Sequence, residues 1–298
     1  MAAEKISVGA FYNSHLTEEI LASGNLIDHL AMADPPHRDD AQFPEVKKRF
    51  VLLLHDYIGQ LADPVPPHAV ERARGLAELY QSPWVAEHCQ CVITEDGRYN
   101  VDYVFPPLYT REMLARYIAN ARALQQALGL PLVVEQIPRY FRIDLDEMSE
   151  GQFLREFFEA TGATFLLDIA HAWLQARYQG RPVRDYLLEL PLDLVTELHI
   201  AGVTEYSDLQ GPWIGPVEPT DEMLDLAAWA FDRMPRVRGV TFDAFSTILK
   251  PGTIPRTIER IRQRLQLPVV SGAPYRMVRG GAESRQVGMS PPGRAEPQ

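Results

Sequence analysis

The sequence predicts an α/β protein whose eight parallel strands close into a (β/α)₈ barrel, the TIM-barrel architecture. Three observations support this prediction. Short apolar segments of strand length alternate with segments of helical periodicity, and such alternation implies a parallel sheet. Eight strand candidates can be counted, which is the number that closes such a barrel. One of them contains the uninterrupted apolar run 165–167, as expected for a strand buried on both faces.

Length, composition and charge narrow the class of protein. The chain has 298 residues, of which 46% are hydrophobic and 23% charged, as in an ordinary globular protein. Its formal net charge of -11 argues against nucleic acid as the main partner, because phosphate binding needs a basic face. The first residues, MAAEKISVGAFY, lack the plan of a signal peptide, and no apolar run has the length of a membrane span. We therefore expect a cytoplasmic protein that does not contact a membrane.

The N-terminal half supplies four strand candidates and their helices. Glu18 and Glu19 follow Thr17 and place negative charge near the positive end of a helix dipole, so a helix is expected there. Residues 44–48 are expected to form one helical turn at most, and a helix near 69–80 follows the loop prolines. Apolar residues recur with helical spacing from 110 to 128, and Gly129 ends that helix. The strand candidates of this half are 5–11, 27–32, 50–54 and 84–89.

The C-terminal half repeats the alternation. Ser149 and Gln152 form a capping box for a helix that ends at Gly162. A short helix is expected at 184–190, and Thr220 caps another. Residues 202–219 are rich in glycine and proline and are expected to form a long loop. The strand candidates of this half are 132–134, 164–168, 195–200 and 239–242, and its last two helices are expected over 221–234 and 253–265.

A single barrel domain is expected over residues 1–270. From Ser271 onward the chain is rich in Gly, Pro, Ser and Arg and poor in core residues, which predicts a disordered tail over 271–298. An open, doubly wound sheet is the alternative to a barrel. The chain contains no GxGxxG or GxxxxGKS motif to support a nucleotide-binding fold of that kind.

The strand ends carry a recurring type of side chain. A carboxylate or an imidazole stands at or just after the end of six strands, and the carboxyl ends of barrel strands meet at one face. Imidazole with carboxylate suits iron, manganese or zinc. Six such groups exceed what one catalytic ion uses if it keeps open positions, so two ions bridged by a carboxylate are expected. The six residues are His55, His88, Glu135, Asp168, His199 and Asp243.

Two neighbouring residues need separate interpretation. Taken alone, Asp168 could simply cap the following helix, with His171 packed as an ordinary helix residue. Glu87 alternates with His88 along its strand, so its side chain should point away from the barrel lumen and into the helix layer.

The ordered set of motifs resembles one known family. The segments LLLHDYIG, AEHCQ, EQIPRY, LLDIAHAW and LHIAGV are followed by DLQGPWIGPVEP and DAFSTI. Together they are similar to the strand motifs of the multinuclear non-heme iron-dependent oxidative enzymes, the barrel proteins related to the methanobactin-biosynthesis oxidase. The match covers most of residues 5–250.

The resemblance implies a TIM barrel that holds two or three irons. Such enzymes use dioxygen to modify a cysteine, aspartate or asparagine of a precursor peptide in natural-product biosynthesis, and a partner protein usually presents the peptide. Glu135 would bridge the ions and, with Asp168 and His199, would carry the catalytic role. The remaining metal ligands would be His55, His88 and Asp243, with His171 and Asp208 as additional ligands.

The chain also departs from the family's pattern. Gln210 and Pro212 stand where the family has two histidines, and Asp243 stands where it has glutamate. His171 stands at the second of two asparagine positions, and the strand candidate 27–32 lacks the usual acidic ligand. We therefore expect two firmly bound ions rather than three.

Two other functions remain open at this point. A sugar isomerase or epimerase, or a phosphodiesterase, on the related xylose-isomerase-like barrel would use zinc, manganese or magnesium, and Glu135 would ligate the metal or move a proton. A binding or scaffold protein that has lost its metal is the third hypothesis.

Overall fold

The predicted barrel is present. The computed structural model describes residues 5–33, 41–55, 58, 60–93, 100–140, 144–208 and 211–269. Eight strands pair in parallel and close in the order β1-β12-β9-β8-β7-β4-β3-β2. Their bounds are β1 (Ser7–Phe11), β2 (His29–Met32), β3 (Val51–His55), β4 (Val85–His88), β7 (Leu132–Glu135), β8 (Thr164–Asp168), β9 (Val195–Ile200) and β12 (Gly239–Phe242).

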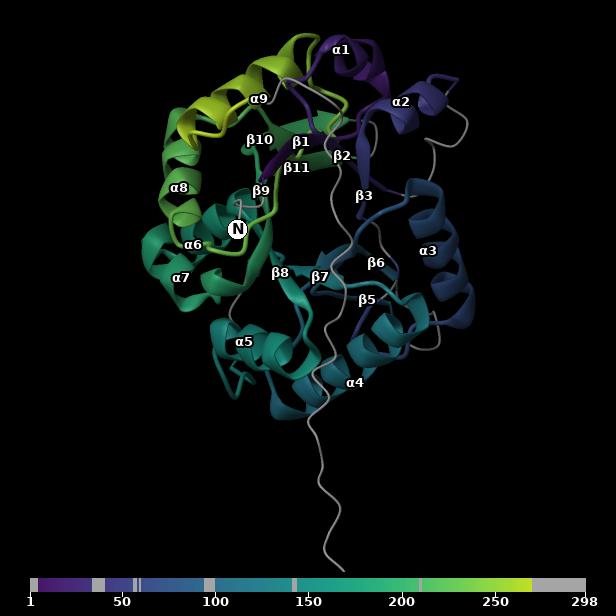
Figure 1. Ribbon diagram of the computed structural model, residues 1–298. Helices are drawn as coiled ribbons and strands as arrows, with labels where there is room; N and C mark the ends of the chain where they lie inside the picture. Colours follow the sequence, from purple (N-terminus) through teal and green to yellow (C-terminus); the bar gives the residue numbers. More distant parts are fainter. Residues whose placement is uncertain are drawn as a thin grey trace, which may run out of the picture.

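Helices surround the barrel on the outside (Figure 1). They are α1 (Thr17–Ala22), α2 (Phe43–Arg49), α3 (Pro67–Tyr80), α4 (Arg111–Leu128), α5 (Glu150–Thr161), α6 (Ile169–Gln179), α7 (Val183–Glu189), α8 (Asp221–Phe231) and α9 (Thr253–Arg264). The expected caps of α5 and α8 form, since Ser149 and Gln152 make the reciprocal capping box and Thr220 accepts the N–H of Met223. Among the described residues, no helix combines the length and apolar character that crossing a membrane requires.

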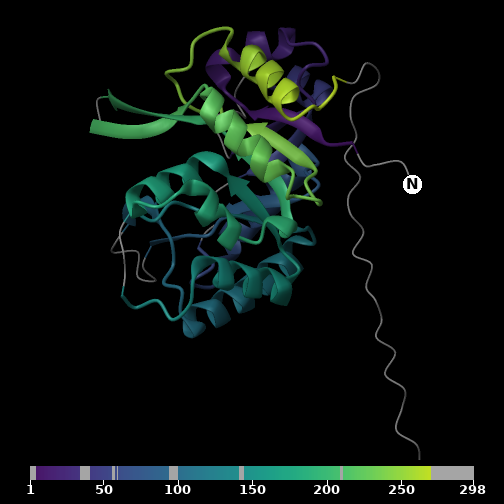
Figure 2. The same ribbon diagram turned by 90° about the vertical axis from the view of Figure 1, so that its left-hand side faces the viewer.

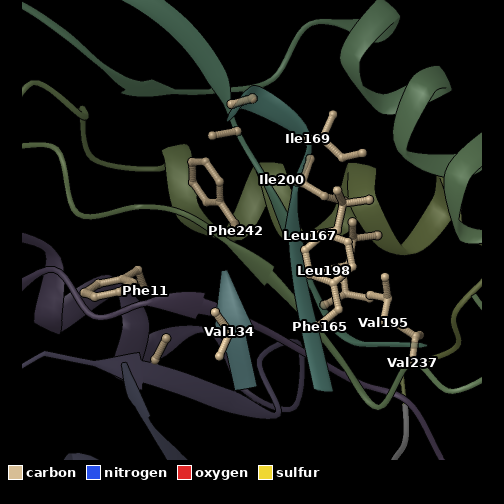
Figure 3. Packing of buried hydrophobic residues seen from close by; sticks show 14 of the residues in the cluster. Phe11, Val134, Phe165, Leu167, Ile169, Val195, Leu198, Ile200, Val237 and Phe242 are labelled. Atoms are coloured by element: carbon tan, nitrogen blue, oxygen red, sulfur yellow. The ribbon is translucent and has the colours of Figure 1, made fainter. Parts of the chain in front are cut away.

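Strand alternation separates two apolar layers. Outward-facing residues of β8 and β9, such as Phe165, Leu167 and Leu198, pack in the large cluster beneath the helices (Figure 3). Inward-facing residues such as Leu53 and Leu166 form a second, smaller cluster that fills the barrel floor. Because successive side chains of a strand alternate between its two faces, the residues two positions after Leu53 and Leu166 also point inward, at the mouth of the barrel.

Two hairpins extend the barrel beyond its predicted elements. Residues 202–219 were expected to form a loop, and this expectation is wrong. They pair as the antiparallel strands β10 (Gly202–Asp208) and β11 (Gly211–Val217), which project from the barrel body (Figure 2). The prolines suggested a loop, but a two-stranded ribbon consists only of edge strands, which tolerate proline. A second hairpin, β5 (Cys91–Ile93) with β6 (Asn100–Phe105), was not predicted.

Two further expectations can be compared with the structure. Helix α2 spans seven residues, so the expectation of one turn at 44–48 is wrong; Pro44 occupies the first turn, where proline is well tolerated. The expected tail, 271–298, lies outside the described residues, as does Gln210.

Candidate metal centre

Glu135 lies at the centre of the predicted strand-end cluster. It ends β7, and its side chain is 2% exposed. Its Oε2 lies 3.0 Å from Nε2 of His55 and 3.3 Å from Nε2 of His88. Its Oε1 faces the other way, 3.1 Å from Nδ1 of His171. One oxygen of the carboxylate therefore faces two imidazoles and the other oxygen faces a third.

The cluster divides into three groups of potential metal ligands. In each group, one donor atom per residue lies within 4.8 Å of the others. Glu135 belongs to two of the groups, and Asp168 and His199 also belong to two each, so the groups share members. The groups are His55–Glu135–His199, Glu135–Asp168–His171 and Asp168–His199–Asp243.

The strands bring these residues together through their register. Asp168 pairs with His199 across β8 and β9, and His88 pairs with Glu135 across β4 and β7. Paired residues of parallel strands share one face, so each pair points into the lumen at one level. His55 is likewise the last residue of β3, and Asp243 directly follows β12.

Asp168 caps helix α6 and also belongs to the candidate ligand cluster. Its Oδ1 accepts the backbone N–H of His171 at 2.9 Å and so caps α6. Its Oδ2 lies 4.0 Å from Nε2 of His171. Gln136 holds the strand end in place, because its amide donates to the Asp168 carbonyl at 2.7 Å. The cap therefore positions the carboxylate and imidazole together.

Burial and charge shift the pKa values of these groups. Burial alone would raise the pKa of Glu135, but the neighbouring His88, His171 and His55 hold it well below its usual range. Burial opposes protonation of His171, yet Asp168 and Glu135 raise its pKa to about 10. Burial raises the pKa of Asp243 to about 7, although His199 lowers it in part. Burial lowers the pKa of His88 to about 3, so His171 and His199, whose pKa values are raised, are the imidazoles that are positively charged when no cation is bound.

The donor atoms fit a metal ion. Nδ1 and Nε2 of His55 and Oε2 of Glu135 are buried without an aligned hydrogen-bond partner in the structure, although Nε2 and Oε2 are close. Buried polar atoms of this kind are costly unless something satisfies them. Imidazole and carboxylate together are ligands for iron, manganese or zinc. A cation at this position would bind one nitrogen of His55 and Oε2 of Glu135 and would offset the carboxylate charge.

The centre opens into a cavity of about 530 Å³ at the carboxyl ends of the strands. Phe11, Tyr140 and Phe245 contribute aromatic side chains to its walls. The segment that carries Phe245 is tied to the first loop, because the Asn13 amide donates to the carbonyls of Ala244 at 2.8 Å and Ser246 at 3.0 Å. The walls are largely apolar, and the ligand groups lie together at the bottom.

The family assignment comes from comparison with known proteins. Residues 27–228 match the family model described as RiPP precursor modification enzyme MbnB/TglH/ChrH. The chain belongs to this family. A UPF0276 protein of Bordetella pertussis is 30% identical over 204 residues, 68% of each chain. A UPF0276 protein of Caulobacter vibrioides is 31% identical over 199 residues, 66% of each chain. The resemblance inferred from the strand motifs is therefore confirmed.

Solved structures of low sequence identity share the fold of this family member. The D-allulose 3-epimerase from Methylomonas sp. has a TM-score of 0.55 at 13% identity and covers 88% of this chain and 99% of its own. A xylose isomerase domain-containing protein from Salmonella typhimurium has a TM-score of 0.55 at 12% identity, with 89% and 99% covered. These likenesses confirm the xylose-isomerase-like TIM barrel and show the fold alone.

Three further residues singled out in the sequence differ in where they lie relative to the centre. His88 is buried beside Glu135, at 3.3 Å, although it belongs to none of the three groups. Glu87 pairs in register with the outward-facing Val134, which confirms that it points away from the lumen. Asp208 ends β10, but its side chain lies outside the described part of the chain.

Sequence analysis missed a polar layer beneath the centre. His29, Glu197 and Thr241 are buried inside the barrel and connected by hydrogen bonds. None of them ends a strand, whereas the recurring ligand-type residues of the sequence stand at strand ends. The period of two could have found Glu197, since it stands two residues before His199 on the same face of β9.

Proposed function

We propose that this chain is an iron-dependent oxidative enzyme that holds two ions and uses dioxygen to modify a residue of a precursor peptide. The observation that carries the proposal is the placement of Glu135. Its two carboxylate oxygens face separate imidazoles, and it belongs to two ligand groups. This is the arrangement a bridging carboxylate needs, and a pair of ions is the economical way to use six or more ligands.

Each ion would be held by side chains from different strands. One would take His55 and His199 with Glu135, with His88 close by, and the other would take Asp168 and His171 with Glu135. Asp243 groups with Asp168 and His199, and we assign it as a further ligand. When bound, ferrous iron with open positions supplies the redox chemistry with dioxygen that no amino-acid side chain has.

The chain's own residues would prepare the site for this chemistry. Glu135, Asp168 and His199 are fixed at strand ends, so they hold their positions without reorganisation. The proton that His171 holds at neutral pH would leave as the ions bind, as would the proton on the fraction of Asp243 that is still protonated there. Phe11 and Phe245 at the cavity wall would exclude water from the bound substrate.

The family and the cavity support this substrate class. The family's description names precursor peptides, and a cysteine, aspartate or asparagine side chain is small enough for a cavity of about 530 Å³. Among the described residues that line the cavity, none is lysine or arginine. That lining offers a phosphate group no cationic side chain away from the metal ions. We include in the proposal a partner protein that presents the peptide.

Metal analysis after anaerobic purification tests the proposal. We expect about two irons per chain and dioxygen consumption that depends on a candidate peptide encoded beside this chain. Zinc or manganese without iron would point instead to an isomerase or epimerase on this barrel. A protein without metal, whose stability is unchanged by added ferrous ion, would point to a scaffold.

A further inference from the structure

A connected polar network lies inside the barrel directly below the candidate metal centre. Glu197 of β9 is 1% exposed and accepts three hydrogen bonds. Trp84 Nε1 donates to its Oε2 at 3.0 Å, and Thr241 Oγ1 donates to its Oε1 at 2.8 Å. Nε2 of His199 lies 3.1 Å from the same Oε1. Thr241 in turn contacts Nε2 of His29 at 2.9 Å.

The direction of each hydrogen bond follows from the groups involved. An ionised carboxylate only accepts, so Trp84, Thr241 and His199 must all donate to Glu197. Because the Thr241 hydroxyl donates its hydrogen to Glu197, its oxygen must accept a hydrogen bond from the Nε2–H of His29. Nδ1 of His29, 2.7 Å from Ser7 Oγ, then accepts the proton of that hydroxyl. Every donor therefore has an acceptor, and only one direction is consistent along the network.

The consequence for the metal centre concerns the two nitrogens of His199. Its Nε2 carries the proton that Glu197 accepts, so in the neutral ring, which is the form that can bind a cation, Nδ1 is the nitrogen with a lone pair. We propose that Glu197 is a positioning residue that fixes His199 in this tautomer and thereby presents Nδ1 to the metal. Histidine ligands in proteins commonly donate their other N–H to a carboxylate that orients the ring. The proposal rests on the proposed function, since it requires a metal at this centre.

An isosteric substitution should reverse the tautomer for a specific reason. In Glu197→Gln, one oxygen becomes an NH₂ group that only donates. Trp84 Nε1 can only donate, whereas the Thr241 hydroxyl and the His199 ring can each accept instead, so the amide must turn its oxygen toward Trp84 and its NH₂ toward His199 and Thr241. Nε2 of His199 then has to accept, and the proton moves to Nδ1, where it blocks coordination. Replacing Trp84 with phenylalanine removes this constraint and lets the amide oxygen turn back to His199.

Nitrogen-15 NMR of histidine-labelled protein loaded with zinc(II), a diamagnetic probe, tests the proposal. A His199→Asn variant identifies the His199 signals. We expect wild-type His199 to show a protonated Nε2 and a metal-bound Nδ1. Glu197→Gln should lose this signature and bind zinc about 10- to 100-fold more weakly. The double variant Trp84→Phe/Glu197→Gln should recover both properties, and Thr241→Val, which leaves the Glu197–His199 contact in place, should retain both.

Several results would overturn the proposal. Coordination of wild-type His199 through Nε2, or a double variant as impaired as Glu197→Gln alone, would each contradict it. The wild-type spectrum decides the matter even if Glu197→Gln does not fold. A wild-type protein that binds no zinc or iron would instead show that the metal centre is wrong, and the positioning role would fall with it.

Discussion

Replacement of Glu135 by glutamine separates a bridging ligand from an ordinary buried carboxylate. In Glu135→Gln one oxygen remains and the other becomes an NH₂ group, which cannot ligate a cation. Because Oε1 and Oε2 face different imidazoles, one ion would lose a ligand outright and the other would keep only a neutral amide oxygen. Both ions would also lose the negative charge that they share.

The expected loss can be bounded. Substitution of a residue that merely supports a metal ligand costs about 10- to 100-fold in affinity. Loss of a shared ligand should exceed that, so we expect each ion to bind more than about 100-fold more weakly, or about 2.7 kcal/mol. Anaerobic ferrous titration against a competing chelator gives the affinities, and plasma emission analysis gives the metal content.

Glu87→Gln is the matched control. Glu87 is also fully buried, on the adjacent strand β4, but it accepts the backbone N–H of Ile58 at 2.6 Å and of His88 at 2.7 Å. Its replacement should cost about 1–3 kcal/mol of folding stability and leave two ions bound. Retention of both ions in Glu135→Gln with unchanged affinity would refute the bridging role. Equal metal losses in the two variants would show that removal of any buried carboxylate charge near the centre weakens metal binding, and would not support a bridging role for Glu135.

Three further outcomes are expected. Chelation should lower the melting temperature, since an ion at about 100 times its dissociation constant contributes about 2.7 kcal/mol by mass action; an unmoved melting curve would count against a shared site. His171 and His199 have pKa values raised from 6.5 to about 10 and about 9, respectively. Their contribution to metal-free stability is therefore complete below pH 6.5 and lost as the pH rises through those values, while metal affinity rises. Chemical unfolding of the metal-free protein and metal titrations between pH 7 and 10 check both trends. Stability and metal affinity that rise together, or fall together, with pH would contradict them. Deletion of residues 275–298 should leave melting temperature and metal content unchanged, whereas a clear drop in either would show that these residues contact the barrel.

The barrel and the centre could be predicted because both depend on local patterns. The run ending at Asp168 has the composition of a doubly buried strand, and parallel strands must bring their carboxyl ends to one face. The convergence of Glu135, His199 and Asp243 therefore follows from topology alone. Topology does not predict how each side chain is oriented. The directions in which the two oxygens of Glu135 face depend on side-chain packing across several strands.

The missed features have equally specific causes. The hairpin β10–β11 was not predicted because its glycines and prolines are typical of loops. Composition alone does not indicate that two parts of such a segment pair with each other. Glu197 was overlooked because it lies in the middle of β9, two residues before His199, whereas the recurring ligand-type residues stand at strand ends. Its partners are distant in sequence, since Trp84 immediately precedes β4 and Thr241 lies in β12, so no local pattern could connect them.

Anomalous diffraction at the iron edge, from crystals of protein loaded anaerobically with excess ferrous ion, tests the central claim most directly. We expect about two full-occupancy peaks, one on either side of the Glu135 carboxylate, with His55 and His199 at one and Asp168 and His171 at the other. Replacing Gln210 by histidine, the residue that the family pattern has there, should then raise occupancy at a third position. Peaks away from Glu135, no peaks at all, or three peaks with the Gln210 oxygen within about 2.3 Å of one would contradict the account.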